Sequence, residues 1–149
     1  FLEYSILSCF ADRMKYKVQA RHSIELNNNV YWVKQYYVIL QYCYQLGVFC
    51  SRSSLSFLKI PKEYIWILTF LQSLNFIYFF LNTQYMFAET LLINCPIMIW
   101  VGFMGGAAYV NVMHNILELP SLRKEEREVA LVMSLMMNDT GILLSAVFT

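Results

Sequence analysis

Charge is what this sequence has least of. Asp, Glu, Lys and Arg make up 14% of its 149 residues, against about 25% in an ordinary soluble domain. Residues 64–88 and 90–117 contain none of the four, and each run exceeds the about 20 residues that a helix needs to cross a bilayer. The formal net charge is +1, which provides no general attraction for nucleic acid. These absences predict a polytopic membrane protein that contacts lipid and binds no nucleic acid.

Enzyme motifs are missing as well. The chain has no glycine-rich phosphate loop, no His-Glu-x-x-His and no Gly-x-Ser-x-Gly. Its four cysteines form no Cys-x-x-Cys pair, and too few histidines lie near them for a zinc site. We therefore expect no enzyme activity, no metal and no cofactor. The cysteines are expected to be free thiols packed as small apolar side chains.

Five apolar segments divide the chain, at about residues 1–10, 30–50, 64–81, 91–117 and 129–149. A bilayer tolerates only helices or closed barrels, and these segments lack the strict alternation of barrel strands. Each segment is therefore expected to be an α-helix, and the expected fold is an all-α membrane bundle.

The Lys and Arg residues between these segments predict the orientation. The stretch 51–63, which includes Arg52, contains three of them, 82–90 contains none, and 118–128 contains three. The alternation places the first and last of these stretches on the cytoplasmic side, with Arg52 in a cytoplasmic loop. The stretch 10–29 breaks the pattern, because it holds four Lys or Arg where the opposite side is expected.

Polar and small residues mark the faces of the expected helices that meet other helices. The second segment carries a stripe that should face protein or water: Lys34, Tyr37, Gln41, Tyr44 and Gln45. In the third segment Thr69, Gln72 and Ser73 cluster on one side. In the fourth segment Gly102, Gly105 and Gly106 are small enough to let two helices approach closely.

Two carboxylates fall inside apolar segments, where charged groups are energetically expensive and suggest function. Asp139 lies about ten residues into the last segment, and Glu3 lies in the apolar opening of the chain. Each could couple protons or contact a substrate. Each could equally serve as a structural hydrogen-bond or ion-pair partner of a neighbouring helix.

Asn111 and His114 are spaced by three residues, so they share one face of the fourth segment together with Asn115. Histidine changes its charge near physiological pH, which suits a solute path out of an acidic compartment. His114 also lies only about one turn from the expected end of the helix, where a structural histidine is equally reasonable. Both interpretations remain open from the residues alone.

Four blocks of the sequence resemble the battenin family and occur in the family's order, and apart from a weak block at the start they cover roughly residues 30 to 149. The run GGAAYVN at 105–111 with HNI at 114–116 resembles its signature. Further blocks are YQLGVF at 44–49 with SRSSL at 51–55, Arg127-Glu128 with DTG at 139–141, and, more weakly, FLEY at 1–4. Residues 5–29 depart from the pattern, which continues there with an Asn-Gln-Gly turn.

The resemblance implies a multi-pass lysosomal or vacuolar membrane protein related to the major facilitator superfamily, working by alternating access. The chain begins at Phe1 rather than Met and stops at Thr149 inside an apolar run. We therefore expect a fragment that forms most of the C-terminal bundle of a major-facilitator-like fold, with the N-terminal bundle absent. The family is linked to export of glycerophosphodiesters, to lysosomal pH and to basic amino acid transport.

Two functional hypotheses follow. In the first, the chain is part of a transporter that exports a small polar solute, with protons as a further partner. Its candidate path residues are Glu3, Asn111, His114 and Asp139. Because the membrane segments offer few cations, the missing N-terminal half is expected to supply most of the positive charge. The alternative is a lysosomal scaffold that transports nothing and regulates pH and trafficking through partners.

Overall fold

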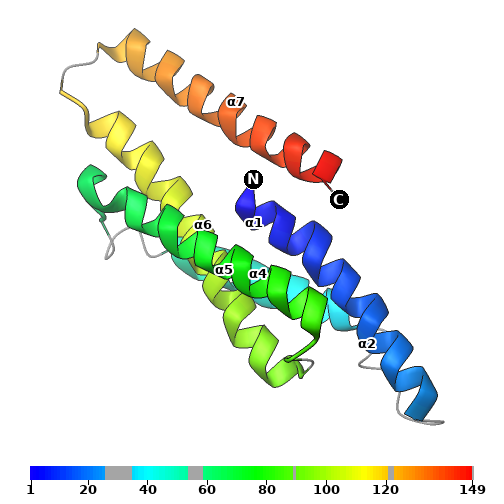
Figure 1. Ribbon diagram of the computed structural model, residues 1–149. Helices are drawn as coiled ribbons and strands as arrows, with labels where there is room; N and C mark the ends of the chain where they lie inside the picture. The colour runs from blue at the N-terminus through cyan, green and yellow to red at the C-terminus, as the bar shows by residue number, and fades with distance from the viewer. Residues whose placement is uncertain (26–34, 54–58, 89, 121–122, 149) are drawn as a thin grey trace.

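The protein is built from helices, with no strand in the residues that the computed structural model describes, which are 1–25, 35–53, 59–88, 90–120 and 123–148 (Figure 1). The helical elements, in chain order, are α1 (Leu2–Ser5), a π-helical turn (Ile6–Phe10), α2 (Ala11–Glu25), α4 (Tyr36–Ser53), a 3-10 turn (Lys62–Tyr64), α5 (Ile65–Tyr85), α6 (Leu91–Glu118) and α7 (Lys124–Phe148). The prediction of an all-α fold is confirmed.

Three of these helical stretches are long and apolar enough to cross a membrane: Lys62–Tyr85, Leu91–Glu118 and Lys124–Val147. They correspond to the third, fourth and fifth apolar segments. The second segment is represented by α4, while its first residues, Lys34 included, lie outside the described part of the chain. The molecule is therefore a multi-pass α-helical membrane protein.

The helix that begins in the first apolar segment does not end near residue 10, as we had expected. The backbone stays helical from α1 through the π-helical turn into α2, which ends at Glu25. The charged stretch continues the helix because it contains no Gly or Pro and is rich in helix-forming residues. It also docks, since Met14 and Val18 are fully buried and the Lys17 ammonium donates to the Thr83 carbonyl. The stretch that broke the charge pattern therefore includes a packed helix.

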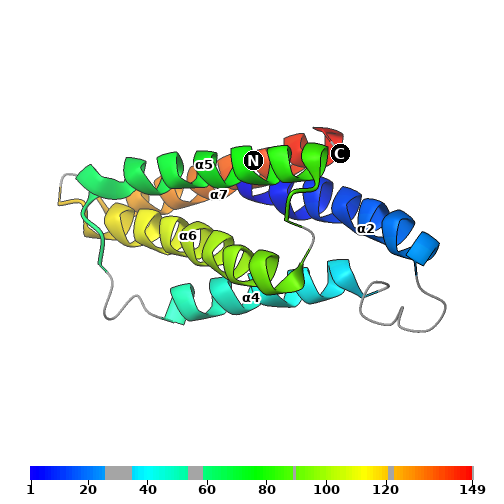
Figure 2. The same cartoon turned by 60° about the horizontal axis from the view of Figure 1, so that its bottom comes forward.

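α4 and α6 run parallel and form the most extensive helix pair (Figure 2). Two glycines make this contact possible, because a Cβ on Gly47 would collide with the Ile99 carbonyl and one on Gly102 with the Tyr44 carbonyl. The two backbones thus touch directly, as small residues allow between membrane helices. Gly106 lies on the same seam against Ser51.

A buried asparagine network closes the turn between α5 and α6. α5 ends at Tyr85, and the next residue, Met86, has a left-handed backbone with φ of 51°. The Asn82 side chain accepts from the Ala88 N–H at 3.0 Å and donates to the Ala88 carbonyl at 3.0 Å. The Asn94 amide donates to the same carbonyl at 2.7 Å and to the Tyr36 hydroxyl at 2.9 Å. The turn satisfies these backbone groups without water, as a membrane interior requires.

Gly102→Ala should destabilise the protein more than Gly106→Ala. At Gly102 the new methyl group meets backbone that cannot move alone, and overpacking typically costs about 1–3 kcal/mol. At Gly106 the nearest atom is the Ser51 Cβ at 3.1 Å, which needs a shift of a few tenths of an ångström. Thermal unfolding of the full-length protein in detergent measures both variants. Equal melting temperatures for the two variants would contradict the seam described here.

Candidate functional site

A cavity of about 440 Å³ opens between α1, α5, α6 and α7. α1 lies between α7 and the α5–α6 pair, which makes it the inner wall of this space (Figure 1). The Ser5 hydroxyl donates to the Ser145 hydroxyl at 3.2 Å and ties α1 to α7. The polar side chains of the lining are Glu3, Thr69, Gln72, Tyr109, Ser134 and Asn138. The volume suits a small solute rather than a single ion.

Glu3 is a half-buried carboxylate in the wall of this cavity. Its Oε1 accepts a 2.6 Å hydrogen bond from the Tyr44 hydroxyl, which reaches across from α4. The carboxylate lies directly against Gly105, where a Cβ would overlap it. Gly105 therefore makes room for Glu3, whereas Gly102 and Gly106 make room for α4. The three glycines predicted to pack helices thus face two different neighbours.

Gln72 contributes a hydrogen-bond donor without a partner. The side chain is buried in α5 and lines the cavity. Its Oε1 accepts from the Asn75 amide at 3.3 Å, but its Nε2 has no hydrogen-bond partner among the described residues. A buried donor left unpaired costs about 1–3 kcal/mol. A bound solute with an acceptor atom would recover that free energy.

Arg52 brings a cation to the edge of the cavity. It lies in the last turn of α4, rather than in the loop where we expected it. Its guanidinium stacks 4.9 Å from the ring centre of Tyr109, and Tyr109 lines the cavity. The charge of Arg52 also acts on the Glu3 carboxylate. No sequence pattern predicted this contact, because Arg52 and Tyr109 belong to different helices.

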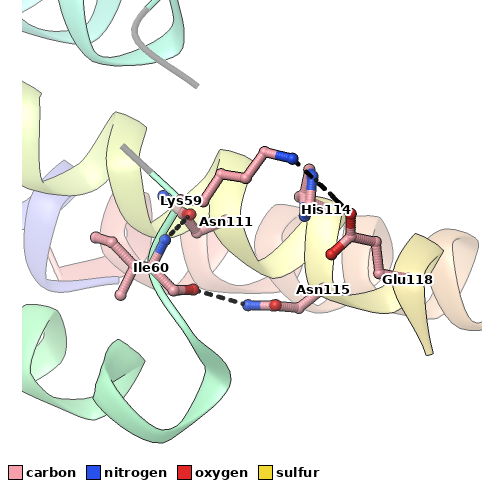
Figure 3. A network of polar contacts seen from close by, with 6 residues as sticks. All are labelled: Lys59, Ile60, Asn111, His114, Asn115 and Glu118. Atoms are coloured by element: carbon pink, nitrogen blue, oxygen red, sulfur yellow. Dashed lines mark hydrogen bonds and ion pairs between the residues drawn. The ribbon is translucent and has the colours of Figure 1, made fainter. Parts of the chain in front are cut away.

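Asn111 and His114 lie elsewhere, where the C-terminal part of α6 meets the segment before α5 (Figure 3). The Asn111 Oδ1 accepts from the Ile60 N–H at 2.7 Å, and the Asn115 amide donates to the Ile60 carbonyl at 3.3 Å. The His114 Nε2 lies 3.3 Å from a Glu118 carboxylate oxygen. These contacts anchor a connecting segment, and neither Asn111 nor His114 is among the described residues that line the cavity.

Asp139 is exposed on α7 and does not line the cavity, although its neighbour Asn138 does. Its Oδ1 accepts from the Asn138 amide at 3.5 Å. The four predicted path residues therefore do not converge within this chain. Only Glu3 reaches the cavity, and the described residues contain no group of three His, Cys, Asp or Glu that could hold a metal.

Long apolar helices around a cavity with a few polar side chains define a multi-pass α-helical membrane protein, and the comparisons identify its family. The family model described as CLN3 protein matches residues 1–149, including the divergent stretch 5–29. The chain belongs to this family, whose curated relatives are named battenin or BTN1. The resemblance seen in the sequence is confirmed.

About a third of the residues are identical where the relatives align with this chain. Battenin of Dictyostelium discoideum is 34% identical over 122 residues, which are 82% of this chain and 28% of that protein. Battenin of Canis lupus familiaris is 37% identical over 111 residues, 74% of this chain and 24% of that protein. Protein BTN1 of Saccharomyces cerevisiae is 34% identical over 110 residues, 74% of this chain and 26% of that protein. The chain thus spans about a quarter of their length. No solved structure matches it.

Asn111→Ala should loosen the segment before α5 without altering the cavity. The Ile60 N–H would lose its acceptor, and an unpaired buried group costs about 1–3 kcal/mol, so its amide should exchange roughly 10- to 100-fold faster. Hydrogen exchange of the full-length protein, read on a peptide that begins at least two residues before Ile60, measures this effect. Asn75→Ala is the control, because Asn75 bonds the Gln72 side chain instead. Unchanged exchange at Ile60 would refute the anchoring role.

Proposed function

We propose that this chain is part of a lysosomal or vacuolar membrane transporter that exports small polar solutes. Family membership suggests glycerophosphodiesters as solutes, and effects on lysosomal pH and basic amino acid transport. The observation that carries the proposal is the half-buried Glu3 carboxylate in the wall of a 440 Å³ cavity between membrane helices. Carboxylates in that setting are expensive and are generally kept for transport or proton transfer.

The local structure around Glu3 supports this proposal. Glu3 lies in α1, which runs directly into the π-helical turn Ile6–Phe10. Such turns break the regular hydrogen-bond ladder of a helix and frequently occur at functional sites. The Tyr44 hydroxyl holds the carboxylate in place at 2.6 Å, and Gly105 gives it space. A positioned but accessible carboxylate can exchange a proton or a polar contact as a solute passes.

Alternating access requires a second wall that moves against the first. The relatives are about four times as long as the matched region, so the remainder of the protein can supply that wall. In this proposal the present chain is a C-terminal bundle of a major-facilitator-like fold. α7 presents much of its apolar surface outward, with Met136, Met137 and Leu143 exposed. That surface is available to lipid or to the rest of the protein.

Glu3→Gln in the full-length protein should reduce solute export at least about tenfold, because the amide keeps the size of the carboxylate but cannot carry its charge. The assay uses lysosomes from cells that lack their own battenin and quantifies the retained glycerophosphodiesters. Protein abundance is matched between variants. Glu63→Gln is the control, since Glu63 is exposed and lies outside the cavity lining.

Each result of this assay separates the hypotheses. Clearance by wild type and by Glu63→Gln but not by Glu3→Gln supports transport through the cavity. Equal clearance by Glu3→Gln would make Glu3 a structural residue. Absence of clearance even by wild type would favour the scaffold that transports nothing. Asp139→Asn, run in parallel, tests whether the exposed face of α7 also belongs to the path.

A further inference from the structure

We propose that Arg52, stacked on Tyr109 at the edge of the cavity, binds the anionic group of the transported solute, with Gln72 as a second donor. This inference rests on the transporter function proposed above and deepens it by assigning the contact that selects the charge of the solute. The chemistry it recognises is that of a phosphodiester or similar monoanion. The sequence had led us to expect that most positive charge would come from elsewhere in the protein.

The first argument is the geometry of the stacked pair. The Arg52 guanidinium lies over the Tyr109 ring, with its Cζ 4.9 Å from the ring centre. A cation held over an aromatic ring does not use its N–H groups in hydrogen bonds with that ring, so they can form a paired contact with a phosphate or carboxylate. Tyr109 itself lines the cavity. The ring thus places the guanidinium beside a residue of the cavity wall.

The second argument is the unpaired donor inside the cavity. The Gln72 Nε2 is buried and has no partner in the described part of the chain, and the side chain lines the same cavity as Tyr109. It offers N–H groups only to an acceptor. A solute with phosphate or carboxylate oxygens would satisfy this donor, whereas an ammonium group would not.

The third argument is that the negative group of the cavity already has partners. The Glu3 carboxylate accepts from the Tyr44 hydroxyl at 2.6 Å and packs against Gly105. Arg52 attracts it as well. The buried Gln72 donor and the Arg52 cation are left for a solute, and both favour an anion.

A phosphodiester can come from a soluble solute or from the headgroup of a phospholipid, and the experiment separates the two. Purified full-length protein in a phosphate-free maltoside detergent is heated with glycerophosphoinositol, glycerophosphocholine or a short-chain phosphatidylinositol. The melting temperature is recorded against ligand concentration, which yields a half-saturating concentration independent of transport. We expect wild type to be stabilised by soluble glycerophosphoinositol, and less by zwitterionic glycerophosphocholine.

The variants test the two residues of the stacked pair. Arg52→Gln should raise the half-saturating concentration of glycerophosphoinositol about tenfold or more, the size of one charged contact. Arg52→Lys should recover part of the affinity, because it keeps the charge but not the planar fork.

Tyr109→Phe should keep wild-type affinity through its ring, and Tyr109→Leu should lose it. Arg123→Gln is the matched control, because Arg123 is exposed just before α7 and does not line the cavity.

Unchanged affinity in Arg52→Gln, with a normal melting temperature without ligand, would overturn the proposal. So would stabilisation by the short-chain lipid alone, which would assign Arg52 to a lipid headgroup. The lysosomal assay separates this failure from failure of the proposed function. If wild type and Arg52→Gln clear glycerophosphoinositol equally, only the assignment of Arg52 fails. If wild type clears no solute, the transporter itself fails, and the assignment of Arg52 fails with it.

Discussion

Direct contact between the backbones of α4 and α6 positions the polar groups of the cavity. Gly47 and Gly102 leave no side chain between the two helices, so groups on α4 reach past α6 to the other side. Tyr44 thereby bonds Glu3 on α1, and Arg52 stacks on Tyr109 of α6. A larger residue at the seam would separate the helices and withdraw both side chains. The cavity chemistry therefore depends on two positions that have no side chain.

The hydrogen-bond partners of each buried polar side chain distinguish structural residues from residues that could contact a solute. The Asn82 and Asn94 amides are used by the turn after α5, and the Asn111 and Asn115 amides bond the Ile60 backbone. Gln72 differs because a buried donor remains unpaired beside the cavity. Every polar side chain inside a membrane costs free energy. Structural residues differ from solute-binding candidates because the protein itself satisfies their hydrogen bonds.

Several features were predictable because they depend on nearby residues. The uncharged runs 64–88 and 90–117 predicted the helices α5 and α6, and family-like blocks predicted the family. The continuation of the first helix to Glu25 was not predicted, because its charged residues suggested a loop. Met14 and Val18 dock that stretch against other helices, and hydropathy along the chain does not reveal such a partner.

By itself the sequence determined that this protein is helical, crosses a membrane and belongs to the CLN3 family, because length, apolarity and sequence blocks are properties of continuous segments. Only the tertiary structure decided which intramembrane polar groups share a cavity. Glu3 faces it, Asn111 anchors a connecting segment, and Asp139 lies exposed on α7. The physical reason is that a side chain's surroundings depend on the rotation and pairing of whole helices. Contacts between distant segments set that rotation and pairing.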